Sequence, residues 1–172
     1  MSKESSLVIE STTFPAKPGD WEADTKVWMK VGCNLEPVPE SGLRATPVPD
    51  SETMNFSIWK DATAYSYLDF DLSEWKSFVF EHANHLSDLD SATLTLYQDM
   101  SFWERDILPD LSRDRKTIEL PLPNSAPEGY WKKVGSPTKI KYILFKFHGK
   151  PAPLSGSFEI GKTHLVRAAP KT

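Results

Sequence analysis

The stretch "IKYILFKF", residues 140–147, is the clearest guide to how the chain folds. Ile143, Phe145 and Phe147 fall on one side of an extended strand, and Tyr142 and Leu144 fall on the other. Successive side chains of a strand point to opposite faces, so a segment that is apolar on both faces is typical of a strand covered on both sides. We therefore expect residues 140–147 to form a central strand.

Other stretches alternate between apolar and polar residues, which is the pattern of a half-buried strand. They are MNFSIW (54–59), SYLDFDL (66–72), ATLTLYQ (92–98) and TIELPL (117–122). With the short segments at 7–12, 26–31, 77–82, 156–161 and 163–168, the chain has about ten predicted strands, separated by turn-rich loops. We predict an all-β domain over residues 1–172, an antiparallel β-sandwich or jelly roll with little helix.

Two proline-rich stretches interrupt the predicted strands. "PVPESGLRATPVPD" (37–50) and "LPNSAPEG" (122–129) contain more proline than a central strand tolerates, because proline has no backbone N–H to donate to a neighbouring strand. Both are expected to be surface loops. Trp75, in "DLSEW", is expected in a turn and packed over the edge of the sandwich.

The charge and composition exclude some classes of partner. The net charge is −4, and no tract gathers the basic residues into the stripe that a phosphate backbone requires, so we do not expect nucleic acid binding. No stretch approaches the roughly 18 apolar residues of a membrane span, and the N-terminus lacks the apolar core of a signal peptide. Cys33 is the only cysteine, so the chain cannot form an internal disulfide. We expect Cys33 to be a buried apolar residue.

The order of the strands resembles that of a known family. "SLVIEST" (6–12), the long stretch 67–99, "TIELPL", "WKKVGSPTKIKYILFKF" (131–147) and "GSFEIGKTHLV" (156–166) resemble the β-jelly-roll carbohydrate-binding modules with a galactose-binding-like fold. The resemblance covers most of the chain. The final strand has Glu159-Ile160-Gly161 where the family often has Ile-Asp-Asp, so no motif supports a structural calcium ion, and we expect no cofactor.

The resemblance implies a function and a place of action. Such modules bind polysaccharide without catalysis, commonly on the concave sheet, and are parts of secreted enzymes. We therefore expect a polysaccharide or oligosaccharide ligand, an extracellular location, and an attached or partner catalytic domain that the module targets to its substrate.

The alternation also sorts the aromatic rings. If Phe56, Leu68 and Leu94 face the core, then Trp59, Tyr67 and Tyr97 face the other way, beside polar residues. A sugar has an apolar C–H face ringed by hydroxyls, so a binding surface needs flat rings and amide or carboxylate groups. The expected polar neighbours are Asn55, Asp69, Thr95 and Glu119. The alternative is that a second layer covers these rings, or that they are cross-strand pairs supporting a solvated sheet.

Loops are expected to add further contacts. "QDMSFWERD" (98–106) follows a predicted strand and is expected to present Trp103 in a polar loop, with Gln98 and Arg105 as hydrogen-bonding groups. Trp131, in "GYWKKV", precedes the central strand and is a second candidate for ligand contact.

Other functions remain as alternatives. A jelly-roll glycoside hydrolase or lyase would use two carboxylates, such as Asp69 and Glu119, as acid and base or nucleophile. A protein-interaction sandwich would use the same rings against another protein. "HANHLSDLD" (82–90) contains His82, His85, Asp88 and Asp90, but it lacks the helical spacing that would place metal ligands together, so a solvated turn is favoured and no metal site is predicted.

Overall fold

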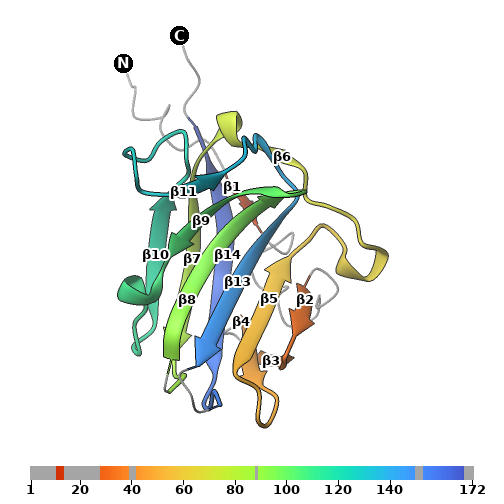
Figure 1. The fold of residues 1–172 in the computed structure, drawn as a ribbon, viewed down its shortest axis with the longest axis vertical. Coiled ribbons are helices and arrows are strands. Elements are labelled where there is room, and N and C mark those ends of the chain that lie inside the picture. Colours follow the sequence, from red (N-terminus) through yellow and green to blue (C-terminus); the bar gives the residue numbers. More distant parts are fainter. Residues whose placement is uncertain (1–10, 14–27, 39–41, 88, 150–152, 169–172) are drawn as a thin grey trace.

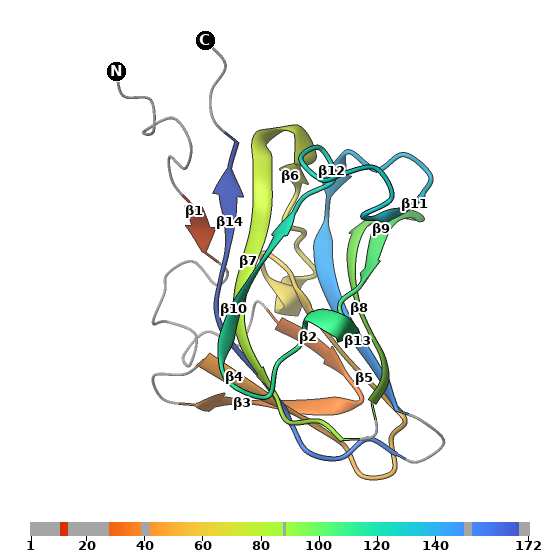
Figure 2. The ribbon, with the colours of Figure 1, turned by 90° about the vertical axis from the view of Figure 1, so that its left-hand side faces the viewer.

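The computed structural model describes residues 11–13, 28–38, 42–87, 89–149 and 153–168. Two antiparallel sheets of six strands face one another across a common core (Figures 1 and 2). Sheet A has the strand order β10-β7-β14-β4-β3, with β1 also paired to β14, and sheet B has the order β11-β9-β8-β13-β5-β2. A small ribbon of β12 and β6 is separate from both. The prediction of an all-β antiparallel sandwich is confirmed.

The strands alternate between the two sheets along much of the chain. Sheet A contains β1 (Ser11–Thr13), β3 (Cys33–Val38), β4 (Gly42–Pro47), β7 (Trp75–Asn84), β10 (Lys116–Pro121) and β14 (Phe158–Arg167). Sheet B contains β2 (Trp28–Val31), β5 (Thr53–Ile58), β8 (Leu89–Gln98), β9 (Ser101–Asp106), β11 (Lys132–Val134) and β13 (Tyr142–Gly149). The ribbon is formed by β6 (Phe70–Asp71) and β12 (Lys139–Ile140).

Helix is scarce, as predicted. In the described residues it is limited to the 3-10 turns η3 (Ala62–Ala64), η4 (Leu72–Glu74) and η5 (Leu108–Asp110). None of the helical segments in this part of the chain has the length and hydropathy needed to cross a membrane.

Phenylalanine rings fill the space between the sheets. Phe145 of sheet B contacts Phe80 of sheet A with ring centroids 5.3 Å apart, and Phe147 contacts Phe158 at 4.8 Å. Phe56 stacks on Phe145 at 5.1 Å within sheet B. These rings are almost completely buried, and each large aromatic ring contributes far more buried apolar area than an aliphatic side chain. The inward-facing rings therefore account for much of the packing that holds the sheets together.

The central strand is placed as predicted, but only one of its faces is covered by a second layer. β13 lies between β8 and β5, and Ile143, Phe145 and Phe147 point into the core. Tyr142 and Leu144 are half-buried on the outer face of sheet B, the face turned away from sheet A. The expectation of burial on both sides is wrong for this reason: the apolar residues on the outer face are covered by neighbouring side chains on the same sheet.

The proline-rich stretch 37–50 is not a loop. It includes the last residues of β3 and all of β4. β3 is the edge strand of sheet A, and a proline such as Pro37 is tolerated there because an edge strand has N–H groups that need no ladder partner. β4 is an inner strand, and its only proline, Pro47, is its last residue.

Three further strand boundaries differ from the prediction. Residues 66–72 form only the short strand β6, because Asp69 has a positive φ of 59° that interrupts the extended chain. Residues 101–106 form β9 instead of a loop. The predicted strands 156–161 and 163–168 are one strand, β14, with an irregularity in register between Ile160 and Thr163. Most of predicted strand 7–12 lies outside the described residues.

Trp75 begins β7 instead of lying in a turn. Its ring is buried, and the Arg167 guanidinium lies 4.3 Å from the ring centroid. The ring therefore packs near the end of sheet A, where β7 and β14 are paired.

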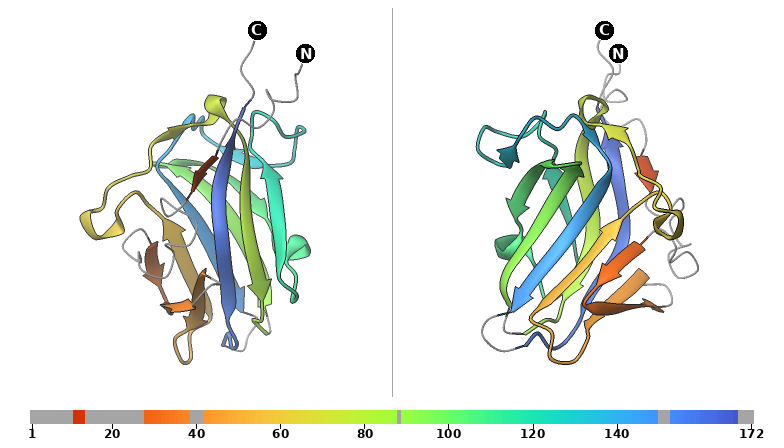
Figure 3. Two further views of the ribbon diagram at one scale, coloured as in Figure 1. Left: turned by 180° about the vertical axis from the view of Figure 1, so that it is seen from behind. Right: turned by 45° about the vertical axis from the view of Figure 1, so that its right-hand side comes forward.

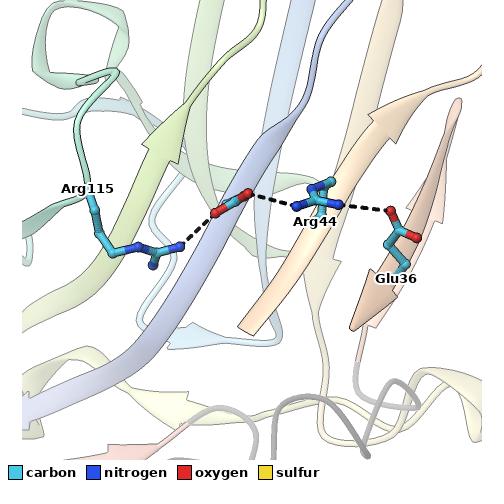
Figure 4. Close-up of polar contacts among 4 residues, drawn as sticks. Glu36, Arg44 and Arg115 are labelled. Atoms are coloured by element: carbon cyan, nitrogen blue, oxygen red, sulfur yellow. Dashed lines mark hydrogen bonds and ion pairs between the residues drawn. The ribbon is translucent and has the colours of Figure 1, made fainter. Parts of the chain in front are cut away.

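A chain of ion pairs crosses the outer face of sheet A (Figure 4). Arg44 lies 3.5 Å from Glu36 and 3.3 Å from Glu159, and the other oxygen of Glu159 lies 2.7 Å from Arg115. Arg115 also pairs with Glu81 at 3.4 Å. These residues come from β3, β4, β14, β7 and the segment before β10. The charges on this face are largely paired with one another.

His82 anchors the segment before β10 from inside the core. The ring is fully buried, Nε2 accepts a hydrogen bond from the backbone N–H of Ser112 at 2.9 Å, and Nδ1 lies 3.1 Å from the carbonyl oxygen of Lys116. Because Nε2 accepts, the neutral ring carries its proton on Nδ1, which donates to that carbonyl. Burial, aided by the nearby charges of Lys116 and Arg115, lowers the pKa of His82.

The stability of the protein is expected to fall as the pH falls below 6.5. In the unfolded chain His82 gains a proton as the pH falls through about 6.5, whereas buried His82 resists protonation until the pH reaches its lowered pKa. Stability is therefore lost between these two pH values. Above pH 6.5 the stabilising contribution of neutral His82 is complete. Burial also lowers the pKa of His164, which contributes with the same sign. The measurement is the urea midpoint at several pH values for the wild type and His82→Gln.

His82→Gln is expected to be less stable at neutral pH and to lose less stability on acidification. His85→Asn is the matched control, because His85 is exposed, and it should keep the wild-type slope. An unchanged pH dependence in His82→Gln would contradict the assignment.

Candidate functional site

The outer face of sheet B is organised in rows that cross its strands. The residues of each row are aligned by the register of β2, β5, β13, β8, β9 and β11. One row contains Tyr142, Tyr97, Phe102 and Val134; the next contains Met29, Ser57, Leu144, Thr95, Glu104 and Lys132; a third contains Val31, Asn55, Lys146, Thr93 and Asp106. Apolar, amide, hydroxyl and charged groups are thus adjacent on this face.

Aromatic rings form a continuous stack along the first of these rows. We call Trp59, Tyr67, Tyr142, Tyr97 and Phe102 the aromatic row. The centroids of Trp59 and Tyr142 are 4.8 Å apart with planes at 7°, and those of Tyr142 and Tyr97 are 5.0 Å apart at 21°. These separations match the spacing of neighbouring strands, about 4.8 Å. The rings of Tyr142 and Tyr97 therefore stand upright on the sheet and face one another.

The stacking leaves Trp59 little open surface. Trp59 is only 8% exposed, and its Nε1–H donates to Ser57 Oγ at 2.9 Å. Rings on opposite faces of Trp59 would be at least about 7 Å apart, twice the contact distance of about 3.5 Å. Tyr67 and Tyr142 are 6.4 Å apart, so both cover the same face of Trp59. Trp59 is therefore largely a support for its neighbours, contrary to its expected role as an open stacking platform.

Tyr67 is the most accessible ring of the aromatic row. It is 46% exposed, and its ring stacks on Trp59 at 5.1 Å. Lys141 Nζ lies 5.7 Å from the Tyr67 ring centroid and 3.3 Å from Asp69 Oδ1. Asp69, Lys141 and Tyr67 thus form an exposed group at the margin of the row.

A hollow of about 170 Å³ lies beside the aromatic row. Trp59, Tyr97 and Tyr142 line it together with Met29, Val31, Asn55, Phe56, Ser57 and Leu144. The side-chain oxygen of Asn55 is buried and accepts no hydrogen bond. A buried acceptor without a donor is costly, so a hydroxyl donor that reached this oxygen after a turn of the Asn55 side chain would find a favourable partner.

Tyr97 and Tyr142 stay protonated over a wide pH range. Burial raises the pKa of Tyr97, and the charge of Glu104 raises it further. Burial also raises the pKa of Tyr142, with added contributions from Tyr97 and Tyr67. Neutral phenols keep an O–H that can donate a hydrogen bond as well as an oxygen that can accept one.

Three other predicted site residues are engaged elsewhere. Trp131 is 5% exposed and donates from Nε1 to the carbonyl oxygen of Pro121, so it belongs to the core. Gln98 Oε1 accepts hydrogen bonds from the backbone N–H groups of Thr138 and Lys139. Arg105 donates to the carbonyl oxygen of Tyr130, pairs with Asp110 at 3.6 Å and lies 3.6 Å over the Tyr130 ring centroid. Gln98 and Arg105 hold loops in place instead of projecting from the aromatic row.

Trp103 lies on a strand, and its side chain falls on the other side of sheet B from the aromatic row. It is aligned with Leu96, which faces the core, and its Nε1–H donates to the carbonyl oxygen of Pro137 at 3.2 Å. Its half-buried ring lines a second hollow of about 310 Å³, together with Asp71, Leu72, Ser73, Asn124, Lys133, Ser136, Pro137 and Thr138. Trp103 is therefore separate from the aromatic row.

The carboxylates considered for a glycosidase do not share a surface. Glu119 lies on β10 of sheet A, where Ser77 Oγ donates to its carboxylate at 2.6 Å. Its neighbours Ile118 and Leu120 face the core, so Glu119 points to the outer face of sheet A. Asp69 pairs with Lys141, next to the outer face of sheet B. The expectation that Glu119 joins Trp59, Tyr67 and Tyr97 is wrong, because β10 belongs to the opposite sheet.

For the His and Asp residues of 82–90, the sequence favours a solvated turn over a metal site. Asp88 lies outside the described residues, and the described part of the chain contains no group of three or more His, Cys, Asp or Glu side chains arranged to hold a metal ion. His82 instead serves the structural role described above.

Sequence reasoning missed Tyr142 and Phe102. Tyr142 was interpreted as part of a strand covered on both sides, although it aligns directly with Tyr97. Phe102 was placed in a loop, although it aligns with Tyr97 from the other side. The alternation within β13 contained the signal for Tyr142, because it put Tyr142 opposite the core-facing Ile143.

The stacked phenols are expected to be visible in an ultraviolet titration of tyrosine ionisation. Of the five tyrosines, Tyr97 and Tyr142 should ionise above the ordinary pKa of about 10. Tyr97→Phe should remove one late-titrating group and lower the pKa of Tyr142, because the charge on Tyr97 no longer opposes its ionisation. Tyr130→Phe is the control and should leave both late ionisations in place.

Comparisons with known proteins bear on the fold. No protein-family model and no curated protein matches the sequence. Among solved structures, the chain is similar to the carbohydrate-binding module CtCBM11, with a TM-score of 0.57 and 16% identity over 98% of this chain and 100% of that one. It is also similar to the agarase AgWH50C, with a TM-score of 0.58 and 11% identity over 87% of this chain.

The chain covers only part of the enzymes among these matches. It spans 24% of the agarase and 23% of an α-L-arabinofuranosidase that matches with a TM-score of 0.49. CtCBM11, by contrast, is matched along its whole length. At these low identities the comparison concerns the fold, and the protein has the fold of the β-sandwich carbohydrate-binding modules.

Proposed function

We propose that this protein binds polysaccharide without catalysis on the outer face of sheet B. The observation that carries the proposal is the aromatic row beside a hollow lined by Asn55, whose buried side-chain oxygen has no hydrogen-bond partner. A sugar presents C–H groups on its faces and hydroxyls at its edges, and this surface offers ring surface and hydrogen-bonding groups next to each other.

The groups of the site have different roles in the proposal. Tyr67 offers the exposed ring on which a sugar face stacks, since the central rings of the row are already stacked on one another. Tyr97 and Tyr142 donate or accept hydrogen bonds through their neutral phenols. Asn55 accepts a hydrogen bond from a sugar hydroxyl in the hollow.

The fold comparison supports binding over catalysis. The match to CtCBM11 extends over its full length, and that protein is described as a carbohydrate-binding module. Glu119 lies on the outer face of sheet A, whereas Asp69 lies in the loop before β6 and pairs with Lys141 next to sheet B, so they do not form the opposed pair that glycoside hydrolysis requires.

The proposal includes a place of action. The agarase contains a region of the same fold within a much longer chain, which supports a role as a module that brings an attached or partner enzyme to its polysaccharide. Insoluble and cell-wall polysaccharides are outside the cell, so the proposed role is extracellular.

The first test is affinity electrophoresis through gels containing β-glucan, xylan, mannan or galactan, with reducing-end release assayed on the same panel. The wild type should be retarded by at least one polymer and release nothing. Tyr67→Ala and Asn55→Ala should each weaken retention by about twofold to tenfold, the effect of losing one ring contact or one neutral hydrogen bond.

Glu36→Gln is the matched control, because Glu36 is an exposed charged residue on the outer face of sheet A. It should bind like the wild type. If Glu36→Gln is no longer retained and Tyr67→Ala still is, the site lies on sheet A and the proposed surface is refuted. Failure of the wild type to bind any polymer would refute the function itself.

A further inference from the structure

The loop between β5 and β6 carries an exposed ring at the end of the aromatic row. This loop includes η3, lies beside β2, and projects past that edge of sheet B (Figures 1 and 3). Tyr65, at the end of η3, is 71% exposed. Its ring lies 6.4 Å from that of Trp59 with planes at 79°, an edge-to-face contact. Whether Tyr65 contributes its edge or one of its faces to this contact, at least one face of its ring is not covered by Trp59.

The backbone of Tyr65 is in an unfavourable conformation. Its φ is 54° and its ψ is 39°, the left-handed region, where the Cβ of an L-residue crowds the following carbonyl oxygen. The other described non-glycine residues at positive φ are Asp50, Asp69 and Asp99, and aspartate tolerates this region better than a bulky aromatic residue does. A glycine or asparagine is the usual choice at the end of a helical turn. The chain thus has tyrosine where stability alone favours a smaller residue.

Hydrogen bonds hold the loop in one conformation. The backbones of Asp61 and Ser66 pair with each other across its base, at 2.8 and 3.2 Å. The Asp61 carboxylate accepts from the N–H and the hydroxyl of Thr63, and the Tyr65 N–H donates to the carbonyl oxygen of Ala62. The backbone that carries the exposed Tyr65 ring is therefore held in one conformation.

The hollow and the aromatic row lead toward this ring. The hollow is lined from β8 through β13 and β5 to Met29 and Val31 of β2, and Trp59 belongs both to the hollow and to the contact with Tyr65. A linear chain that crosses the strands of sheet B and leaves over β2 passes next to the loop. We infer that Tyr65 extends the polysaccharide-binding surface beyond the edge of sheet B and contacts sugars that the sheet itself does not reach. This inference rests on the proposed function.

The test compares Tyr65→Asn and Tyr65→Phe on the polysaccharide that retains the wild type, and on oligosaccharides of increasing length made from it. Asparagine accepts the left-handed conformation but has no ring, and phenylalanine keeps the ring. Tyr65→Asn should bind the longest oligosaccharides about twofold to tenfold more weakly and the shortest ones as the wild type does, while its melting temperature should not fall. Tyr65→Phe should keep the wild-type dependence on length.

Asp50→Asn is the matched control, since Asp50 is also at positive φ but lies between β4 and β5, at the opposite end of β5. It should not change binding at any length. If Tyr65→Asn binds long and short oligosaccharides like the wild type, the inference is overturned while the proposed function survives. If Tyr65→Asn loses stability and loses binding equally at all lengths, the ring is a structural support and the inference is also overturned. Absence of binding by the wild type refutes the proposed function first.

Discussion

The packing of phenylalanine rings between the sheets determines where every other side chain of the sandwich lies. Phe145 and Phe147 of β13 meet Phe80 and Phe158 of sheet A, and this contact fixes which face of each strand turns inward. Because side chains alternate along a strand, the choice also fixes the outward face. A shift of β13 by one residue would bury Tyr142 and Lys146 and expose the phenylalanines. The outward direction of the aromatic row thus depends on the packing of the core.

The two outer faces use this constraint differently. On sheet A, Arg44, Glu159 and Arg115 form ion pairs along a line that crosses the strands (Figure 4). On sheet B, tyrosine and tryptophan rings stack along a line that also crosses the strands. Both are cross-strand contacts between aligned residues, which are the local unit of sheet stabilisation. The ionic face satisfies its own groups, whereas the aromatic face leaves a hollow and an unpaired amide oxygen.

Much of the fold could be predicted from the sequence, because alternation is a local property. The inward residues of β5, β8, β10 and β13 follow from it, and so does the outward direction of Trp59, Tyr67 and Tyr97. β9 was missed because the turn before it, at Asp99 and Met100, lacks the glycine that usually marks a tight hairpin, and Asp99 adopts the positive φ itself. β3 was missed because an edge strand accepts proline and the sequence does not reveal which strand is at an edge, and β4 was missed because its only proline, Pro47, is its last residue.

The site was harder to predict than the fold, since it depends on contacts between distant segments. Asp69 and Glu119 have the same pattern of apolar neighbours, but Glu119 lies on β10 of sheet A and Asp69 in the loop before β6, an arrangement that the alternation does not show. Trp131 and Trp103 looked like accessible loop residues, but the carbonyl oxygens of Pro121 and Pro137 hold their indoles against the body of the protein. The exposure of an aromatic side chain is decided by its partners, and those partners are far away in the sequence.

The mutual stacking of the aromatic row has a consequence for how the protein behaves in water. A large exposed apolar patch promotes self-association. In this protein the rings of Trp59, Tyr142 and Tyr97 shield one another, so that mainly their edges and phenol groups face solvent. The stacking thereby reduces the apolar surface that these three rings expose. The same stacking holds the rings in fixed orientations before a ligand binds, so binding costs little side-chain conformational entropy.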